Sequence, residues 1–364
     1  MSSFSGSYDP ADVEFLLKPL CMEPIADIEL KERLIQSGKK HYSEMISVEQ
    51  QPDTEYLELF DRSVKLNLPK MAEDLYWVTR RIRAARITEE IVIVSLARAG
   101  TPIGIGIKRL LEQEFSTPAK HYSISIIRDR GIDARALEHI LGRHSAESLV
   151  FVDGWTGKGA ISQELEDSLL RYRGGPIGQI PRDLFVLCDL GGVATACGSA
   201  EDYLIPSAIL NSTVSGLVSR TILNHLVSPK DFHGCLFYKE LAEFDRSRWF
   251  VEHLIYGVTQ LLPKLRMLPS PAIETAIIRQ RMLGWIETLK NEFSISNVNL
   301  IKPGICEATR ALLRRSAQTL FVREPASDQT QHLLHLAEKN KVKVAVREDM
   351  PFLATVLIRS LSHG

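Results

Sequence analysis

The chain has 364 residues, more than one hydrophobic core usually organises, so we expect two domains. Hydrophobic residues make up 45% and charged residues 24%, as in ordinary soluble proteins, and the net charge of -1 excludes a general attraction to nucleic acid. The scattered cysteines Cys21, Cys188, Cys197, Cys235 and Cys306 argue against a disulfide framework. The sequence shows neither a signal peptide nor a stretch of about eighteen apolar residues, so we predict a cytoplasmic protein.

The first ninety residues are predicted to be mostly helical, with a short amphipathic segment opening at Asp9 and a longer one over residues 69–87. Strands and helices then alternate, which predicts a parallel sheet covered on both faces. The expected strands are 91–96, 122–127, 149–152 and 184–188, and the expected helices are 102–114, 134–141 and 160–171.

Residues 190–219 are rich in small side chains and are expected to shape a pocket. A helix over 269–293 then leads into a second α/β pattern. That pattern has strands at 297–301, 319–323 and 341–346, and helices at 305–315, 329–340 and 352–361. The predicted organisation is an extension (1–88), an α/β domain (89–270), a linker helix (271–294) and a C-terminal domain (295–364).

The segment LVFVDGWTGKGA ends a predicted strand in Asp153 and continues through a glycine-rich turn into a helix. Glycines let backbone amides approach an anion, and a helix N-terminus adds unpaired N–H groups. Asp153 is placed to accept hydrogen bonds from ribose hydroxyls or to hold Mg²⁺ through water. The predicted phosphate-binding residues are Thr156, Gly157, Lys158, Gly159 and Ala160. The alternative is a plain strand–turn–helix connection.

This order of elements resembles the phosphoribosyl-pyrophosphate motif of type I phosphoribosyltransferases, except that Gly154 stands where that motif has a second acid. The earlier segment IVIVSLARAGTPIG resembles the family's pyrophosphate loop, which often contains a non-proline cis bond. The resemblance implies that Arg98 clamps pyrophosphate, with amides from Ala99 and Gly100. An ordinary turn carrying a surface arginine is the alternative.

Between these loops, the segment ISIIRDRGID stands where the family carries a mobile lid. Arg128 and Arg130 would cover pyrophosphate and exclude water, with Asp129 pairing to one of them. A solvated charged loop explains the same residues.

The stretches SLARAGTP, SIIRDRGID, FVDGWTGKGAI and LIPSAILNSTVSGLVSRT are similar to a wider family. These are phosphoribosyltransferases joined to a Pelota-type RNA-binding domain in tellurite-resistance stress operons, also labelled cysteine protease StiP. The resemblance implies a type I phosphoribosyltransferase-like sheet with a small C-terminal RNA-binding domain. It implies that phosphoribosyl pyrophosphate, or a related ribose phosphate, and Mg²⁺ yield a ribonucleoside-like product. Asn211, Ser212 and Arg220 are the candidates for an acceptor pocket, or else they form a structural turn.

The tail segment PGICEATRALLRR resembles the strand-to-helix junction of Pelota and ribosomal proteins that bind kinked RNA, with Cys306 in place of an asparagine. Nearby cations would form a basic surface for phosphate contacts, although a solvated helix face is equally consistent. The candidate RNA residues are Lys302, Gly304, Glu307, Arg310 and Arg314, with Arg315 beside them.

Phosphoribosyl transfer is the main functional prediction. One alternative is a nucleotide-sensing RNA-binding protein without chemistry. Another is a cysteine protease, in which His225 or His233 would serve Cys197 or Cys235, although no local pattern pairs them. The sequence leaves a homo-oligomer open.

Overall fold

The centre of the molecule is a six-stranded sheet in which every neighbouring pair of strands is parallel. The structure is a computed structural model that describes residues 4–360. Across the sheet, the strands are β1 (Glu14–Phe15), β4 (Ala119–Ile124), β3 (Ile91–Leu96), β7 (Leu149–Thr156), β8 (Leu184–Asp189) and β9 (Ala196–Ser199). The expected mixed α/β fold around a parallel sheet is therefore confirmed.

Helices cover both faces of this sheet, so its strands are apolar on both sides. Ile91 and Ile93 of β3 lie in one core cluster, and Val92 and Val94 lie in the other. Successive side chains of a strand point to opposite faces, which explains the continuous apolar run. The helices are α2 (Thr54–Ala85), α3 (Gly100–Gln113) and α6 (Ser247–Leu265) on the first face and α4 (Ala134–Leu141) and α5 (Ala160–Arg171) on the second. Within residues 4–360, no helix combines the length and apolar character that a bilayer crossing requires.

The predicted helical extension, residues 1–88, is only partly helical. The chain forms turns around Asp9, where an amphipathic segment was expected, and then adds β1 to the edge of the main sheet. Next, β2 (Lys18–Pro19) pairs in parallel with β10 (Gly234–Cys235). These strands of two residues are too short to show the alternation that identifies a strand in a sequence. The first helix is α1 (Ile28–Gln36).

The long helix α2 begins at Thr54 rather than at Pro69, which lies inside it. Its start is set by Asp53, whose carboxylate accepts a hydrogen bond of 2.8 Å from the amide of Tyr56. The prediction began too late because proline was taken as the start of a helix.

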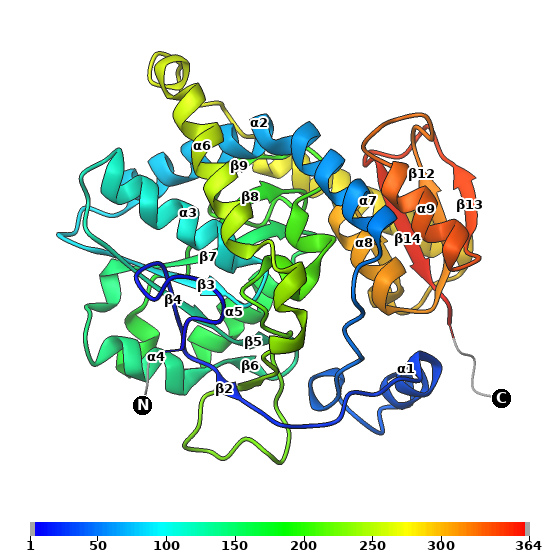
Figure 1. The fold of residues 1–364 in the computed structure, drawn as a ribbon, viewed down its shortest axis with the longest axis horizontal. Helices are drawn as coiled ribbons and strands as arrows, with labels where there is room; N and C mark the ends of the chain where they lie inside the picture. Colours follow the sequence, from blue (N-terminus) through cyan, green and yellow to red (C-terminus); the bar gives the residue numbers. More distant parts are fainter. Residues whose placement is uncertain (1–3, 361–364) are drawn as a thin grey trace.

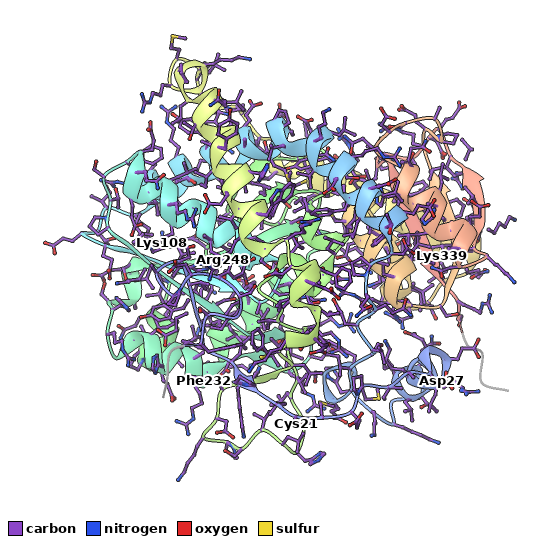
Figure 2. The ribbon with its side chains drawn as sticks, in the orientation of Figure 1. Cys21, Asp27, Lys108, Phe232, Arg248 and Lys339 are labelled. Carbon is purple, nitrogen blue, oxygen red and sulfur yellow. The ribbon has the colours of Figure 1, made fainter. Side chains whose placement is uncertain are left out.

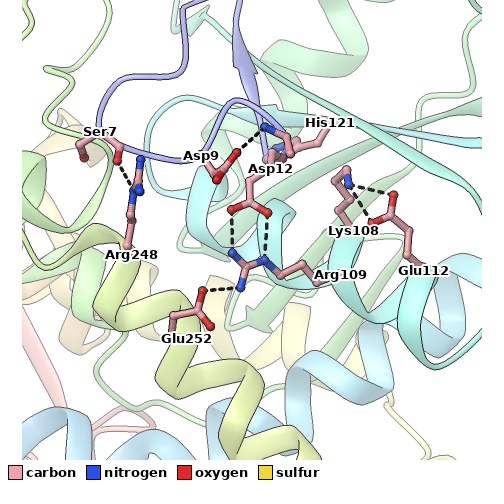
Figure 3. Close-up of polar contacts among 10 residues, drawn as sticks. Ser7, Asp9, Asp12, Lys108, Arg109, Glu112, His121, Arg248 and Glu252 are labelled. Carbon is pink, nitrogen blue, oxygen red and sulfur yellow. Dashed lines mark hydrogen bonds and ion pairs between the residues drawn. The ribbon is translucent and has the colours of Figure 1, made fainter.

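The N-terminal segment is held to the main domain by a partly buried polar cluster (Figure 3). Arg109 of α3 donates two hydrogen bonds to the Asp12 carboxylate, at 2.9 and 2.7 Å, and a third to Glu252 of α6, at 2.7 Å. His121 lies beneath, with its ring nitrogens 3.1 Å from the Asp12 carbonyl oxygen and 2.8 Å from the Ser95 hydroxyl. Burial lowers the pKa of His121 to about 3, so this histidine is a neutral structural residue.

The C-terminal domain lies beside the main sheet at one end of the molecule (Figure 1). Its four strands follow the order β11-β14-β12-β13, and one core cluster runs through it into the main domain. Its elements are α7 (Thr275–Phe293), β11 (Ile301–Pro303), α8 (Ile305–Arg314), β12 (Ala317–Val322), α9 (Gln331–Lys339), β13 (Lys343–Val346) and β14 (Ala354–Ile358). The main domain also contains a short antiparallel hairpin of β5 (Ile126–Ile127) and β6 (Gly131–Ile132).

The prediction of a helix over residues 352–361 is wrong, because this segment forms strand β14. The strand is fully buried and pairs antiparallel with β11 on one side and β12 on the other. A short apolar run has the same sequence appearance in a buried strand and in a buried helix, and here the neighbouring strand edges decide.

We predict that Gly198→Ala destabilises the fold, because α2 packs directly on β9 at this glycine. A Cβ atom at Gly198 would lie 2.4 Å from the Cβ atom of Asp74 and 2.6 Å from its carbonyl oxygen. The expected loss is about 1–3 kcal/mol in the free energy of unfolding, measured by urea denaturation. The control is Gly284→Ala, at an exposed position of α7 where an added Cβ atom would have no neighbour within 4 Å. It should be neutral or stabilising. Equal stability of Gly198→Ala and the native protein would contradict the close contact.

Candidate functional site

The two loops expected to bind phosphate lie against each other at the carboxyl ends of β3 and β7. A Cβ atom added at Gly100 would lie 2.4 Å from the carbonyl oxygen of Val152. One added at Gly154 would lie 3.3 Å from the carbonyl oxygen of Ala99. The loops therefore meet, as expected, but they touch through their backbones at these positions.

Helix α8 of the C-terminal domain covers the last residues of β7 and the turn that follows, residues 155–159, which is called the turn after β7 below. The indole Nε1 of Trp155 donates to the Glu307 carboxylate at 3.4 Å, and the Arg310 guanidinium lies 4.3 Å from the centroid of the Trp155 ring. A Cβ atom at Gly157 would lie 3.2 Å from Cγ of Glu307. The side of the turn that was expected to face a sugar phosphate faces another part of the same chain.

The polar groups of this turn already have partners. The Thr156 hydroxyl donates to the Asp189 carboxylate and accepts from the Gly191 amide at 3.0 Å. The Lys158 ammonium donates to the Val298 carbonyl oxygen, and burial lowers its pKa to about 7. Gly159 has a φ of 92° and caps α5, which begins at Ala160. Phosphate binding by this turn stays a prediction, and it would have to displace these contacts.

Asp153, which the resemblance implied as a Mg²⁺ ligand, is buried and bonded within its own loop. Its carboxylate accepts a hydrogen bond of 2.7 Å from the Gly154 amide. Burial raises the pKa of Asp153 to about 7, although Gly154 and Arg310 oppose the shift. Mg²⁺ binding by Asp153 stays a prediction. Among the described residues, no group of three or more His, Cys, Asp or Glu is arranged to hold a metal ion.

Arg98 lines a separate cavity of about 470 Å³, which none of residues 154–160 lines. Its Nη1 donates to the Val218 carbonyl oxygen at 2.8 Å and lies 3.6 Å from the Glu49 carboxylate. The peptide bond between Ala97 and Arg98 is cis, in the loop where the resemblance implies such a bond.

The candidate acceptor residues gather around the same cavity as Arg98. Asn211 and Arg220 line it. Ser212 donates from its amide and its hydroxyl to Glu49, at 2.9 and 2.7 Å. The structure therefore brings these residues together with Arg98, and their role as an acceptor pocket stays a prediction.

The predicted lid contacts residues 42–44. The Arg128 amide donates to the Tyr42 hydroxyl at 2.8 Å, and Arg130 pairs with Glu44 at 2.6 Å. Asp129 pairs with Arg128 at 3.1 Å, as expected. A role for this segment as a lid stays a prediction.

The candidate RNA residues do not form the exposed basic surface that was expected. A Cβ atom at Gly304 would lie 2.5 Å from Cδ1 of Leu190, and the Ile305 amide donates to Asp202 at 2.8 Å. Lys302 is half-buried. Glu307 and Arg310 contact the turn after β7, and Arg314 lines the cavity that contains Arg98. The correction has a packing cause, because α8 uses this face to dock on the main domain.

The cysteines considered from the sequence are unsuited to nucleophilic catalysis. Burial raises the pKa of Cys197 and of Cys235 to about 12, which keeps both thiols protonated. The Nδ1 atom of His233 lies 2.8 Å from the Ser125 hydroxyl, so this ring nitrogen already has a hydrogen-bond partner. Burial likewise raises the pKa of Cys188 and Cys306.

Cys21 differs from the other four cysteines, because it is exposed at the edge of the molecule (Figure 2). It lines a surface hollow of about 710 Å³ together with His225, Asn224, Lys40 and Arg130. A thiol, an imidazole and two cations therefore share one accessible space.

The pairing of β2 with β10 brings these two distant segments together. The Lys18 ammonium extends from β2 to the loop that carries His225, where it donates to the Leu226 carbonyl oxygen at 3.0 Å and to Asp231 at 2.7 Å. The Asn224 side chain accepts from the Leu226 amide at 3.0 Å, which fixes the loop on both sides of His225. Sequence reasoning missed Cys21 because its neighbours come from a segment far along the chain, and no local pattern marks them.

Two protein families and one full-length relative match this chain. Residues 281–360 match the family described as the PELOTA RNA binding domain. Residues 6–255 match the family described as tellurite-like stress resistance cysteine protease StiP. The cysteine protease StiP of Acinetobacter baylyi (strain ATCC 33305 / BD413 / ADP1) is 41% identical over 375 aligned residues, which cover 99% of this chain and 96% of that protein. The chain belongs to the StiP family.

Similarity to solved structures is weak. The asparagine mutant from an analysis of an invariant aspartic acid in HPRTs is 14% identical, with a TM-score of 0.28, over 48% of this chain and 93% of that chain. The corresponding glutamic acid mutant is 16% identical, with a TM-score of 0.25, over 35% and 72%. Neither likeness carries an argument about this protein.

The prediction of phosphoribosyl transfer as the main function is wrong. The family matched over residues 6–255, and the relative that matches the whole chain, are both named as cysteine proteases. The packing of α8 over the turn after β7 agrees with this correction, because that turn faces Glu307 and Arg310.

Proposed function

We propose that this chain is a thiol-dependent peptidase in which Cys21 is the nucleophile and His225 the proton-transfer group. The observation that supports the proposal is the exposed Cys21 thiol, which shares a hollow of about 710 Å³ with the His225 imidazole. The names of the family and of the A. baylyi relative agree with it. The family description also suggests that the activity serves resistance to stress.

Charges of both signs line the hollow. Lys40 and Arg130 supply positive charge that favours a sulfur anion, while Glu23 and Glu44 supply negative charge. Arg130 is held by Glu44, which lines the same hollow, at 2.6 Å. The side-chain amide of Asn224 donates to the Glu44 carbonyl oxygen at 3.4 Å, so the loop that carries His225 is tied to the segment that carries Glu44.

The chemistry follows from these groups. His225 removes the proton of Cys21, and the thiolate attacks the carbonyl carbon of a peptide bond. The C–N bond breaks, the leaving amine takes its proton from the His225 imidazolium, and a thioester to Cys21 remains. Water, giving a proton to His225, then attacks the thioester, and the acid and the free thiol are released.

We predict that Cys21→Ser and His225→Gln each lower the cleavage of fluorescently labelled casein by at least about a hundredfold. Stoichiometric iodoacetamide under native conditions should label Cys21 first and remove the activity, because the other thiols are buried. The measurement combines the cleavage rate with mass spectrometry of the labelled peptide.

The matched control is His253→Gln, on α6, whose ring contacts the Trp249 carbonyl oxygen outside the hollow. It should retain casein cleavage. Full activity in Cys21→Ser, or inactivation that tracks labelling of another cysteine, would overturn the assignment.

RNA binding is a second candidate function, favoured by the match of residues 281–360 to the PELOTA RNA binding domain. The face of α8 with Glu307 and Arg310 packs on Trp155 in this structure. RNA can use that face only after α8 leaves the main domain. The closed contact would therefore compete with RNA.

We predict that Trp155→Ala tightens binding of a fluorescein-labelled RNA hairpin by about tenfold, because it removes contacts that hold α8 closed. Fluorescence anisotropy measures the affinity. Trp249→Ala controls for general loosening, since Trp249 packs on Phe60 of α2. Equal RNA affinity of the native protein and both variants would count against this route.

A further inference from the structure

The cavity that contains Arg98 carries an excess of buried positive charge. It lies where the N-terminal segment, the main domain and the C-terminal domain meet. Seven cations line it. Arg315 pairs with Glu32, Lys339 pairs with Asp53, and Arg359 is exposed. The other four come from four separate segments and are Lys31, Arg98, Arg220 and Arg314. The carboxylates on its wall are Glu29, which is exposed, Asp53, which pairs with Lys339, and Glu49. Among the described lining residues, Glu49 is therefore the acid left for these cations. It acts on Arg98 and Arg314, while Glu32, which does not line the cavity, acts on Lys31.

Two of these guanidinium groups have unused donors. Buried Nη1 of Arg220 and buried Nη2 of Arg314 have no hydrogen-bond partner among the described residues. Nη2 of Arg220 donates to the Tyr42 carbonyl oxygen at 2.6 Å. Glu49 lies 3.6 Å from Arg98 and accepts two hydrogen bonds from Ser212, all through Oε1, and neither unused donor bonds to it.

The cations repel one another across the cavity. The pKa of Lys31 falls to about 8, first because it is buried and next because Arg220 lies nearby. The pKa of Arg220 falls to about 10, again from burial and with Arg98 as the repelling neighbour. Buried like charges cost free energy unless an opposite charge joins them. An anion that enters the cavity would recover part of that cost.

We propose that this cavity is a binding site for a small organic phosphate. Several guanidinium groups around one space suit a phosphate, which accepts bidentate hydrogen bonds and carries up to two charges. The volume of about 470 Å³ is large enough for a metabolite rather than an ion alone. Ile209, Leu210 and Leu312 give it an apolar wall for the organic part.

The site is separate from the proposed peptidase centre. The hollow that contains Cys21 and His225 and the cavity that contains Arg314 share no lining residue. Binding can therefore be tested whether or not the chain cleaves peptides. Because Arg314 belongs to α8 and Lys31 to α1, a bound phosphate would join three parts of the chain.

Isothermal titration of the full chain with adenosine monophosphate, inorganic pyrophosphate and adenosine tests the proposal. Both phosphates should bind, adenosine should not, and adenosine monophosphate should bind more tightly than pyrophosphate because its organic part contacts the apolar wall. Arg314→Met should weaken phosphate binding by about tenfold or more. Glu49→Gln should tighten it, because the competing carboxylate is gone and the amide oxygen still accepts from Ser212.

The matched control Arg135→Met removes an exposed arginine of α4 and should leave the affinity unchanged. If Arg314→Met fails to fold, the opposite sign expected for Glu49→Gln still tests the site. Absence of binding by both phosphates at millimolar concentration would overturn the proposal. So would equal affinity in the native protein and Arg314→Met, weaker binding in Glu49→Gln, or tighter binding of pyrophosphate than of adenosine monophosphate.

Discussion

The docking of α8 on the main domain is the contact on which the rest of the arrangement depends. Asp202 of the main domain accepts hydrogen bonds from the amides of Ile305 and Leu353, each at 2.8 Å. Ile305 begins α8, and the first amides of a helix have no partner within it, so a residue of another domain completes this helix. Further along, Glu307 and Arg310 reach Trp155. Residues that the sequence assigned to separate phosphate and RNA sites therefore contact each other in the fold.

This docking also explains the distribution of charge. Arg314 enters the space beside Arg98 because α8 lies against the main domain, and Glu49 lies between them. The resulting cavity gathers cations from distant parts of the chain, and the hollow with Cys21 adjoins it across residues 25–26 and 45–46 without sharing a lining residue. The two proposed chemistries, nucleophilic and anion-binding, would thus use adjoining but separate spaces.

Much of the fold could be predicted from the sequence where the local pattern is unambiguous. The run Ile91–Leu96 is apolar at every position, and α4 begins at a capping Asp133 and ends before Gly142, so both segments were placed correctly. The segment that contains β14 was misjudged because its neighbours on both sides decide its form. The candidate sites were harder to predict from the sequence than the fold. Cys21 and His225 line one hollow because the pairing of β2 with β10, together with contacts such as Asn224 to Met22, brings distant segments together. The role of Glu49 depends on arginines that lie on other segments.

Hydrogen–deuterium exchange at the amides of Ile305 and Leu353 tests the docking most directly, because each amide bonds to Asp202 rather than within its own domain. Both amides should exchange slowly in the full chain, and Asp202→Ala should speed their exchange while the centre of β12 stays protected. Fast exchange at Ile305 in the native protein, at the rate of a free helix end, would show that α8 does not rest on the main domain.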